Sequence, residues 1–73
     1  MDDEKKQLKE TMEKFPAGTK FRYRGYLYHV LGTFDDYNLA VKYYGKHHQW
    51  WHYEFLHAWT LKIGCEDGRI KLK

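Results

Sequence analysis

Apolar residues recur every three or four positions in the first part of the chain and every second position in much of the rest. Leu8, Met12 and Phe15 form one narrow apolar stripe among lysines and glutamates, which is typical of a surface helix that buries a single face. Pro16 ends this pattern, because the residue before a proline disfavours helical geometry. The pattern predicts a helix over residues 1–15 that covers the remaining body as a lid, the alternative being a partner-binding helix.

The clearest strand pattern lies in residues 19–24, where Phe21 and Tyr23 alternate with basic side chains. Gly25 and Tyr26 then fit the two central positions of a type II′ turn, in which glycine takes the first place. Folding the chain at this turn gives three cross-strand pairs: Tyr23 with Tyr28, Arg22 with His29 and Phe21 with Val30. One face of the hairpin is therefore expected to be apolar and buried, and the other basic.

Two further strands follow, each after a polar turn. Residues 35–38 are expected to form the first turn and residues 39–44 the third strand. Residues 45–48 form the second turn, which leads into a run dominated by rings at residues 49–57. The dense rings favour strands, because aromatic side chains fit a pleated, half-buried surface.

Alternation alone leaves open which face of residues 49–57 is buried. Trp51, Tyr53 and Phe55 lie on one face, and the other face includes Glu54. An unpaired carboxylate is costly to bury. We therefore expect the three rings to point into the core.

The C-terminal part predicts a short helical turn at residues 56–59 and then a final hairpin over residues 61–72. Asp67-Gly68 is a strong signal for a type I′ turn at its centre. This turn places Cys65, the only cysteine, opposite Ile70. A free cysteine in that place is expected to be a small core residue.

Together these elements predict one α+β domain over residues 1–73 that is mostly β. A helix at 1–15 packs on a body at 18–73, which is expected to be a small, strongly curved antiparallel sheet of five or six strands, or an SH3-like barrel. The body contains a hairpin of the form Phe-x-Tyr-x-Gly-x-x-Tyr-x-Val followed by a meander. This order resembles the small SH3-like barrels, which include Tudor and chromo-type modules, over residues 18–61.

Composition points to binding. Thirteen of the fourteen aromatic residues fall between Phe21 and Trp59, which is more large rings than so small a core can hide. The net charge is +3. Residues 1–14 hold five acidic residues and four lysines, whereas residues 15–73 hold nine lysines or arginines and five acidic residues. The body is thus mildly basic, which permits an anionic partner without requiring one.

The same composition bears on compartment. A single thiol without a disulfide framework favours a reducing setting. The charged N-terminus is unlike a signal peptide, and no apolar run approaches the roughly 20 residues of a membrane span. We expect a cytoplasmic protein with no membrane partner.

Catalysis, metals and cofactors find little support in the sequence. The chain has no serine, and no pair of acidic residues shows an obvious general acid–base spacing. His47, His48, His52 and His57 mix even and odd offsets, so they do not share one strand face, and no second cysteine or carboxylate cluster completes a metal-ligand set. The prediction is a protein that is not an enzyme and has no catalytic residue, metal site or cofactor.

The mixture of basic and aromatic side chains is the better lead. Basic residues could contact phosphates while exposed rings stack on bases, and the same side chains could form a protein interface. A third interpretation is an aromatic cage for a methylated ammonium group, with Glu54 or Asp36 as its acid. The candidate binding residues are Arg22, Arg24, Tyr26, Lys42, Tyr44, Lys46, His47, His48 and Trp50.

Two functions follow from this lead. The first is a small protein-interaction module that docks on a larger protein, such as an inhibitor or adaptor of the kind carried by phages and mobile elements. The second is a nucleic-acid-binding β-barrel. We favour the first from the sequence, because the net charge is modest and acidic residues interrupt the basic body. A second basic strand beside residues 20–24 would favour nucleic acid, and the sequence pattern shows none clearly. The sequence does not define the oligomeric state.

Overall fold

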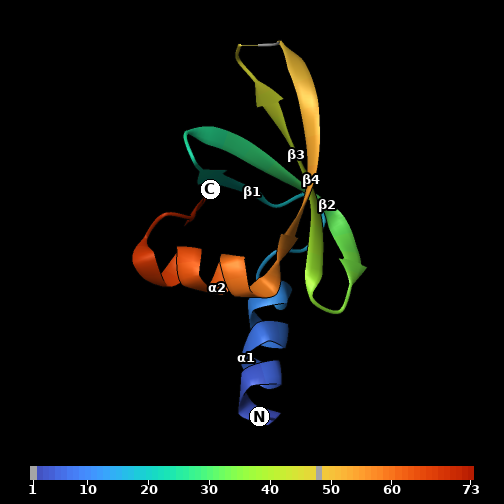
Figure 1. The fold of residues 1–73 in the computed structure, drawn as a ribbon, viewed down its shortest axis with the longest axis vertical. Coiled ribbons are helices and arrows are strands. Elements are labelled where there is room, and N and C mark those ends of the chain that lie inside the picture. The colour runs from blue at the N-terminus through green and yellow to red at the C-terminus, as the bar shows by residue number, and fades with distance from the viewer. Residues whose placement is uncertain (1, 48) are drawn as a thin grey trace.

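The computed structural model describes residues 2–47 and 49–73. Two helices and five strands follow one another along the chain (Figure 1): α1 (Asp2–Glu13), β1 (Lys20–Tyr23), β2 (Tyr26–Asp35), β3 (Asn38–Gly45), β4 (Trp50–His57), α2 (Ala58–Asp67) and β5 (Lys71–Leu72). The strands form one antiparallel sheet in the order β4-β3-β2-β1-β5. Both helices lie at one end of the molecule, and the β3–β4 ribbon extends to the other end.

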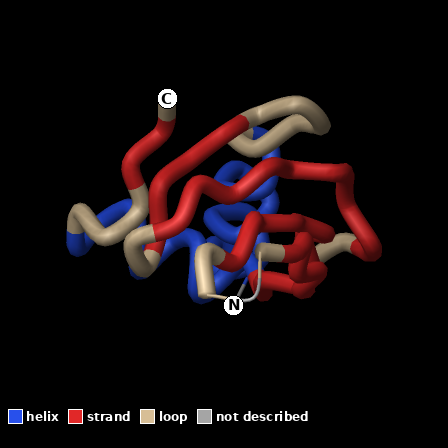
Figure 2. The backbone as a smooth tube through the Cα atoms, turned by 90° about the horizontal axis from the view of Figure 1, so that it is seen from above, coloured by secondary structure: helices blue, strands red, loops and turns tan. Residues whose placement is uncertain are grey.

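The predicted α+β class with an N-terminal helix and a five-stranded antiparallel sheet is confirmed, but both predicted forms of the body are wrong: the sheet is neither strongly curved nor an SH3-like barrel. The sheet stays open, with β4 at one edge and β5 at the other, and the strands do not close on themselves (Figure 2). The reason lies in the C-terminal part of the chain. Residues 58–67 form a helix in place of a strand, so nothing joins the two edges.

Helix α1 follows the predicted pattern closely. Leu8, Met12 and Phe15 are buried in the hydrophobic core, and the Phe15 ring meets the Phe21 ring edge-on with centroids 5.3 Å apart. Thr11 is also buried on this face, and its hydroxyl donates a hydrogen bond to the carbonyl of Gln7. The stripe therefore covers the core from one end, as expected of a lid, with α2 as its helical neighbour.

The β1–β2 hairpin has the predicted faces and a different register. Its turn is Arg24-Gly25, with φ of 54° and 80°, and positive values at both central positions define a type I′ turn. Tyr23 consequently pairs with Tyr26 and Phe21 with Tyr28. The slip is two residues from the predicted pairing, and an even slip returns every side chain to the same face.

The turn between β2 and β3 is the predicted polar turn. An Asp35 carboxylate oxygen accepts a hydrogen bond from the backbone N–H of Tyr37 at 2.9 Å, and the side chain of Asn38 donates to both carboxylate oxygens of Asp35. These hydrogen bonds hold the pKa of Asp35 below its usual value. Two register shifts in β2, after Val30 and after Thr33, bend this ribbon.

The predicted burial of the β4 rings is wrong. Trp51, Tyr53 and Phe55 lie on the exposed face, and Leu56 points into the core. The pairing with β3 explains this choice, because Leu56 lies opposite the fully buried Leu39. Keeping this leucine inside places Glu54 on the inner side as well, although one of its oxygens has no hydrogen-bond partner among the described residues.

The predicted C-terminal hairpin is also wrong, apart from the helical turn expected near its start. The His57 imidazole caps α2 by accepting a hydrogen bond from the Trp59 backbone N–H at 3.1 Å. Gly68, with φ of 78°, ends the helix in the left-handed conformation instead of forming a strand turn. Cys65 lies on the helix, partly buried against the core as expected of a small apolar residue. Neither described helix is long and apolar enough to cross a membrane.

Candidate binding surface

The sheet has two different faces. The inner face packs on the helices and carries the core residues of every long strand. The opposite side, here called the outer face, collects the side chains that alternate with them. By the strand register it comprises Lys20, Arg22, Leu27, His29, Leu31, Lys42, Tyr44, Trp51, Tyr53, Phe55 and Lys71.

The basic part of the outer face comes from two neighbouring strands. Lys71 of β5 lies directly opposite Arg22 of β1. Beyond the strand end, the backbone N–H of Lys73 donates to the carbonyl of Lys20 at 3.0 Å, so alternation carries Lys73 to the side of Lys71. A second basic strand therefore lies beside the first, which is the arrangement that the sequence pattern did not reveal.

Positive charge continues from these strands toward the middle of the sheet. Successive cross-strand partners form a row over four strands: Lys20, His29, Lys42 and Tyr53. Partial burial lowers the pKa of His29, and the charges of Lys20 and Lys42 on either side lower it further. The imidazole thus lies in a positive field that an anionic ligand would relieve.

Aromatic rings dominate the other part of the outer face, and Trp51 is at their centre. The rings of His29 and Tyr44 meet the Trp51 ring edge-on, with centroids 5.4 and 5.5 Å away. The Lys42 ammonium lies 4.5 Å from the centre of the Trp51 ring, within cation–π range. Charge and aromatic surface are therefore joined at one point.

Three rings beside this centre are open to solvent. Tyr53 is 67% exposed, Phe55 61% and Phe34 66%. Phe34 reaches Phe55 from the bent end of β2, with ring centroids 4.6 Å apart. So much exposed aromatic surface on one face is unusual for a protein that acts alone.

A shallow hollow of about 260 Å³ lies where the basic and aromatic parts meet. It brings together four of the predicted binding residues, Arg22, Tyr26, Tyr44 and Lys46, with His29 and Leu27 also in its wall. Tyr44 lies on β3 and Lys46 just beyond its end, whereas the others belong to the β1–β2 hairpin. The β1–β2 hairpin thus supplies most of the hollow's lining together with Arg22, and the β3–β4 ribbon adds the second cationic side chain, Lys46.

The remaining predicted residues lie elsewhere or carry a different role. The Arg24 guanidinium lies 5.0 Å from the ring centre of Tyr23, an inner-face residue, so Arg24 does not continue the outer basic row as expected. His47 is exposed in the loop before β4, and His48 lies outside the described residues. Trp50 is 71% exposed at the far end of the β3–β4 ribbon.

An aromatic cage would need converging rings around a space, but the rings that converge on the inner side pack against one another. Tyr43 contacts Tyr26 with centroids 4.9 Å apart, Tyr28 at 4.7 Å and His52 at 5.2 Å. Direct ring-to-ring packing fills the space that a bound ammonium group would need. Of the two acids considered, Glu54 lies on this side, whereas Asp36 is in the exposed β2–β3 turn.

Acidic side chains are sparse on the outer face. Among the described residues, Asp35 at the end of β2, opposite Asn38, is the one acid at a strand position of this face. Asp36 lies in the turn that follows, and the other acids lie on the helices or at the inner Glu54. The modest net charge of +3 therefore understates the field at this face.

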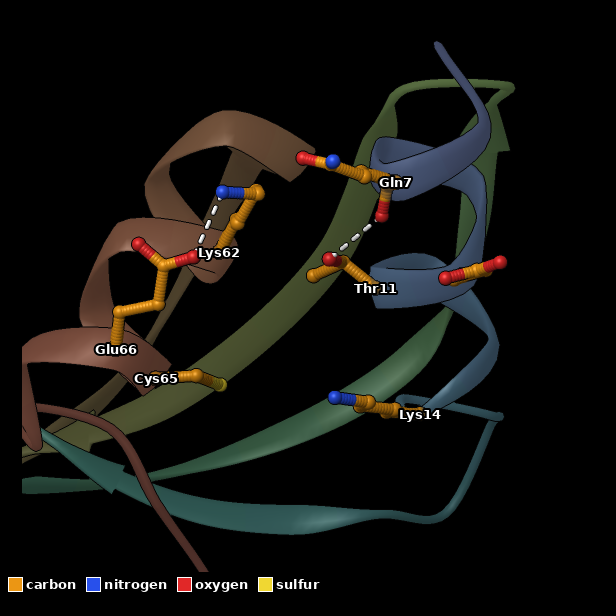
Figure 3. A pocket seen from close by; sticks show the side chains of 7 residues that line it. Gln7, Thr11, Lys14, Lys62, Cys65 and Glu66 are labelled. Atoms are coloured by element: carbon orange, nitrogen blue, oxygen red, sulfur yellow. Dashed lines mark hydrogen bonds and ion pairs between the residues drawn. The ribbon is translucent and has the colours of Figure 1, made fainter. Parts of the chain in front are cut away.

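A polar groove of about 320 Å³ between the two helices is the main alternative site (Figure 3). Its walls mix both charges, and Lys62 is paired with Glu66 at 2.7 Å. Cys65 and Lys14 also line the groove (Figure 3). Burial raises the pKa of the Cys65 thiol, which keeps it in the poorly nucleophilic protonated form. The part of the chain that is described contains no group of three potential metal ligands.

Comparison with protein-family models, with curated proteins and with solved structures found no match for this chain. The candidate binding surface therefore rests on the geometry of this chain and not on a similarity to another protein. Sequence reasoning missed Lys71, Trp51, Tyr53 and Phe55 as outer-face residues. The hairpin expected over residues 61–72 did place a strand at Lys71 and Leu72, but it paired that strand with residues that form α2 instead of with β1.

Proposed function

We propose that this protein is a non-enzymatic binding module that holds single-stranded nucleic acid across the outer face of its sheet. One observation carries the proposal: the basic pair of strands β1 and β5 lies on the same face of the sheet as the exposed rings of β4. Single-strand binding needs both parts, a positive surface for the backbone and rings for the bases.

The register suggests how a strand would lie. Phosphates would contact Lys71, Arg22 and Lys20 at the basic side, and bases would stack on Tyr53 and Phe55 at the other. Five strands span about 19 Å from first to last, which is room for several nucleotides. Lys42 lies between the basic strands and the exposed rings, with its ammonium group over the Trp51 ring. From this position it would neutralise a phosphate while it keeps its contact with the ring.

Single strands suit this surface better than a duplex. Exposed rings contribute only when bases can turn away from their own partners, and each base–ring stack is worth about 1–3 kcal/mol. The outer face is a broad sheet, whereas the elements that fit a duplex major groove are a helix or a two-stranded ribbon. Sequence preference is expected to be weak.

A second candidate, docking on a larger protein as an inhibitor or adaptor, is favoured by a separate observation. Trp50 is the most exposed large apolar side chain among the described residues, and it forms the terminal pair of the β3–β4 ribbon with Gly45. This ribbon extends away from the two helices (Figure 1). A projecting tryptophan is well suited to fill a pocket in a partner. Under both candidates a cytoplasmic location stays a prediction.

The test is binding of fluorescent single- and double-stranded oligonucleotides over a salt series. Arg22→Ala with Lys71→Ala should weaken single-strand binding and lower the salt slope by about 1.4, because each phosphate contact to a single strand contributes about 0.7. Lys6→Ala with Lys9→Ala is the matched control, since it removes two exposed charges from α1. It should change the slope much less.

The outcomes separate the two candidates. Equal effects of both double variants would mean that only net charge matters, which contradicts a site on the outer face. If the wild type shows no oligonucleotide affinity at physiological salt, the nucleic-acid proposal is wrong. Capture of a specific protein that is lost in Trp50→Ala would then support the docking candidate.

A further inference from the structure

The β4 edge of the sheet is open along its whole length. β4 pairs with β3 over eight consecutive residues without a register shift, and no other strand of the described chain lies on its far side. The backbone N–H of Ala58 donates to the carbonyl of Tyr37 at 2.7 Å, which sets the phase of the ladder. Because hydrogen-bonded pairs alternate, the backbone groups of Trp51, Tyr53 and Phe55 point outward from the edge.

The two edges of the sheet differ in protection. β5 is only two residues long and includes Lys71, and short strands and lysines are the devices with which proteins prevent edge-to-edge pairing. β4 has fewer of them: it contains no lysine, no proline and no bulge, and its one charged residue of this kind is Glu54 on the inner side. Its outward-pointing backbone groups belong to three large, solvent-exposed rings.

We propose that this edge pairs with the same edge of a second copy of the chain, β4 antiparallel to β4, around a two-fold axis at Tyr53. Only residues with outward backbone groups can exchange hydrogen bonds across the interface, so odd positions must face odd positions. Centring the pair on Tyr53 uses nearly the whole strand. It places Trp51 opposite Phe55 of the second copy, and cross-strand aromatic pairs of this kind stabilise a sheet.

Charge selects the same register. With the axis at Tyr53, Glu54 lies opposite His52 of the second copy, twice in the symmetric pair. Moving the axis by one residue, to Glu54, would set two glutamates directly opposite each other, which is unfavourable. Glu54 has an inner oxygen without a hydrogen-bond partner among the described residues, so an added basic neighbour would stabilise this carboxylate.

The pairing leaves the outer face accessible. Side chains on a strand stand above and below the sheet, whereas the new hydrogen bonds lie in its plane. Two five-stranded sheets would become continuous, with the rings of both copies in the middle and the basic strands at the two ends. The inference is independent of the ligand that the outer face binds.

Sedimentation and light scattering test the oligomeric state from micromolar to millimolar concentration. The wild type should approach twice the 9.0 kDa mass of the chain. Tyr53→Lys places two lysines opposite each other at the axis and should shift the protein to monomer. Tyr44→Lys is the matched control, because Tyr44 is exposed on the same face but lies on β3, inside the sheet; it should stay dimeric.

Cross-linking tests the register, in a Cys65→Ala background that removes the native thiol. Cysteines at position 53 would have Cα atoms about 5.5 Å apart across the axis, whereas cysteines at position 55 would be about 14 Å apart. A short thiol cross-linker should therefore join Tyr53→Cys chains and not Phe55→Cys chains. A wild type that stays monomeric at millimolar concentration, or a dimer that cross-links better through position 55, overturns the proposal.

Discussion

The ring of Phe21 lies stacked on the ring of Tyr28, its cross-strand partner, with centroids 5.2 Å apart and an interplanar angle of 11°. Both side chains are almost fully buried. This pair joins the first hairpin to the helical end, because Phe15 meets Phe21 and Tyr43 meets Tyr28. The centre of stability is therefore aromatic.

Phe21→Ala should consequently lower the free energy of unfolding by about 3–5 kcal/mol, since it removes a buried ring and leaves a cavity. In a domain this small such a loss would leave little folded protein. Phe34→Ala removes the same atoms from an exposed ring and should change stability far less. Urea unfolding measures both. Similar midpoints for the two variants would contradict the assigned faces.

Deleting residues 2–14 should destabilise the domain, because Leu8 and Met12 leave the core with α1. The truncated protein should bind a dye that reports exposed apolar surface, and its melting temperature should fall. A single variant on the exposed side of the same helix, Lys9→Ala, provides the control. If the truncated chain melts like the full chain, the helix is not a lid, and a role in binding a partner would explain its stripe better.

Alkaline pH should unfold the protein through Tyr28. Burial raises the pKa of Tyr28 to about 12, with smaller contributions from Glu54 and Tyr43, against about 10 in an unfolded chain. Its contribution to stability is complete below about pH 10 and is lost as the pH rises toward 12. Absorbance of ionised tyrosine should show one late titration that coincides with unfolding. The Tyr28→Phe variant should lack this late titration. If all seven tyrosines ionise while the protein stays folded, ionisation of Tyr28 does not cause the unfolding.

Binding of an oligonucleotide should tighten as the pH falls. The pKa of His29 is lowered by burial and by the charges of Lys20 and Lys42. The folded protein therefore favours the neutral imidazole, and the stability that this preference contributes is lost as the pH falls below about 6.5. Phosphates nearby would favour the protonated imidazole, and binding would then take up a proton. Affinity measured between pH 8 and pH 5.5 should rise in the wild type and rise less in His29→Gln. Parallel profiles would exclude His29 from the site.

The first half of the fold could be predicted because its patterns are local. The stripe ending at Phe15, the alternation around Tyr23 and the polar turn at Asp35 each need only neighbouring residues, and the structure agrees with all three. The hairpin register was harder, since Gly25 suits either central position of a two-residue turn. Choosing the other position shifts every pair and leaves both faces unchanged.

The second half could not be predicted because its signals have two meanings. Gly68 takes a left-handed conformation both in a type I′ turn and at a helix end, and the spacing of Ala58, Leu61 and Cys65 was the evidence for the helix. The face of β4 depends on its partner strand, which places Leu56 beside Leu39. The penalty for Glu54 was the wrong criterion there, since the packing of leucine outweighed it.

The pairing of β5 with β1 has a consequence for how the basic surface comes into being. Lys20 and Arg22 are near the beginning of the sheet-forming chain, and Lys71 is near its end. The strip they form does not exist in any local segment; it requires β5 to be docked against β1. A polyanion bound across it would therefore hold the chain closed and raise the stability of the fold with the logarithm of the polyanion concentration once that exceeds Kd. Removing the last three residues should abolish that protection and leave every exposed ring in place.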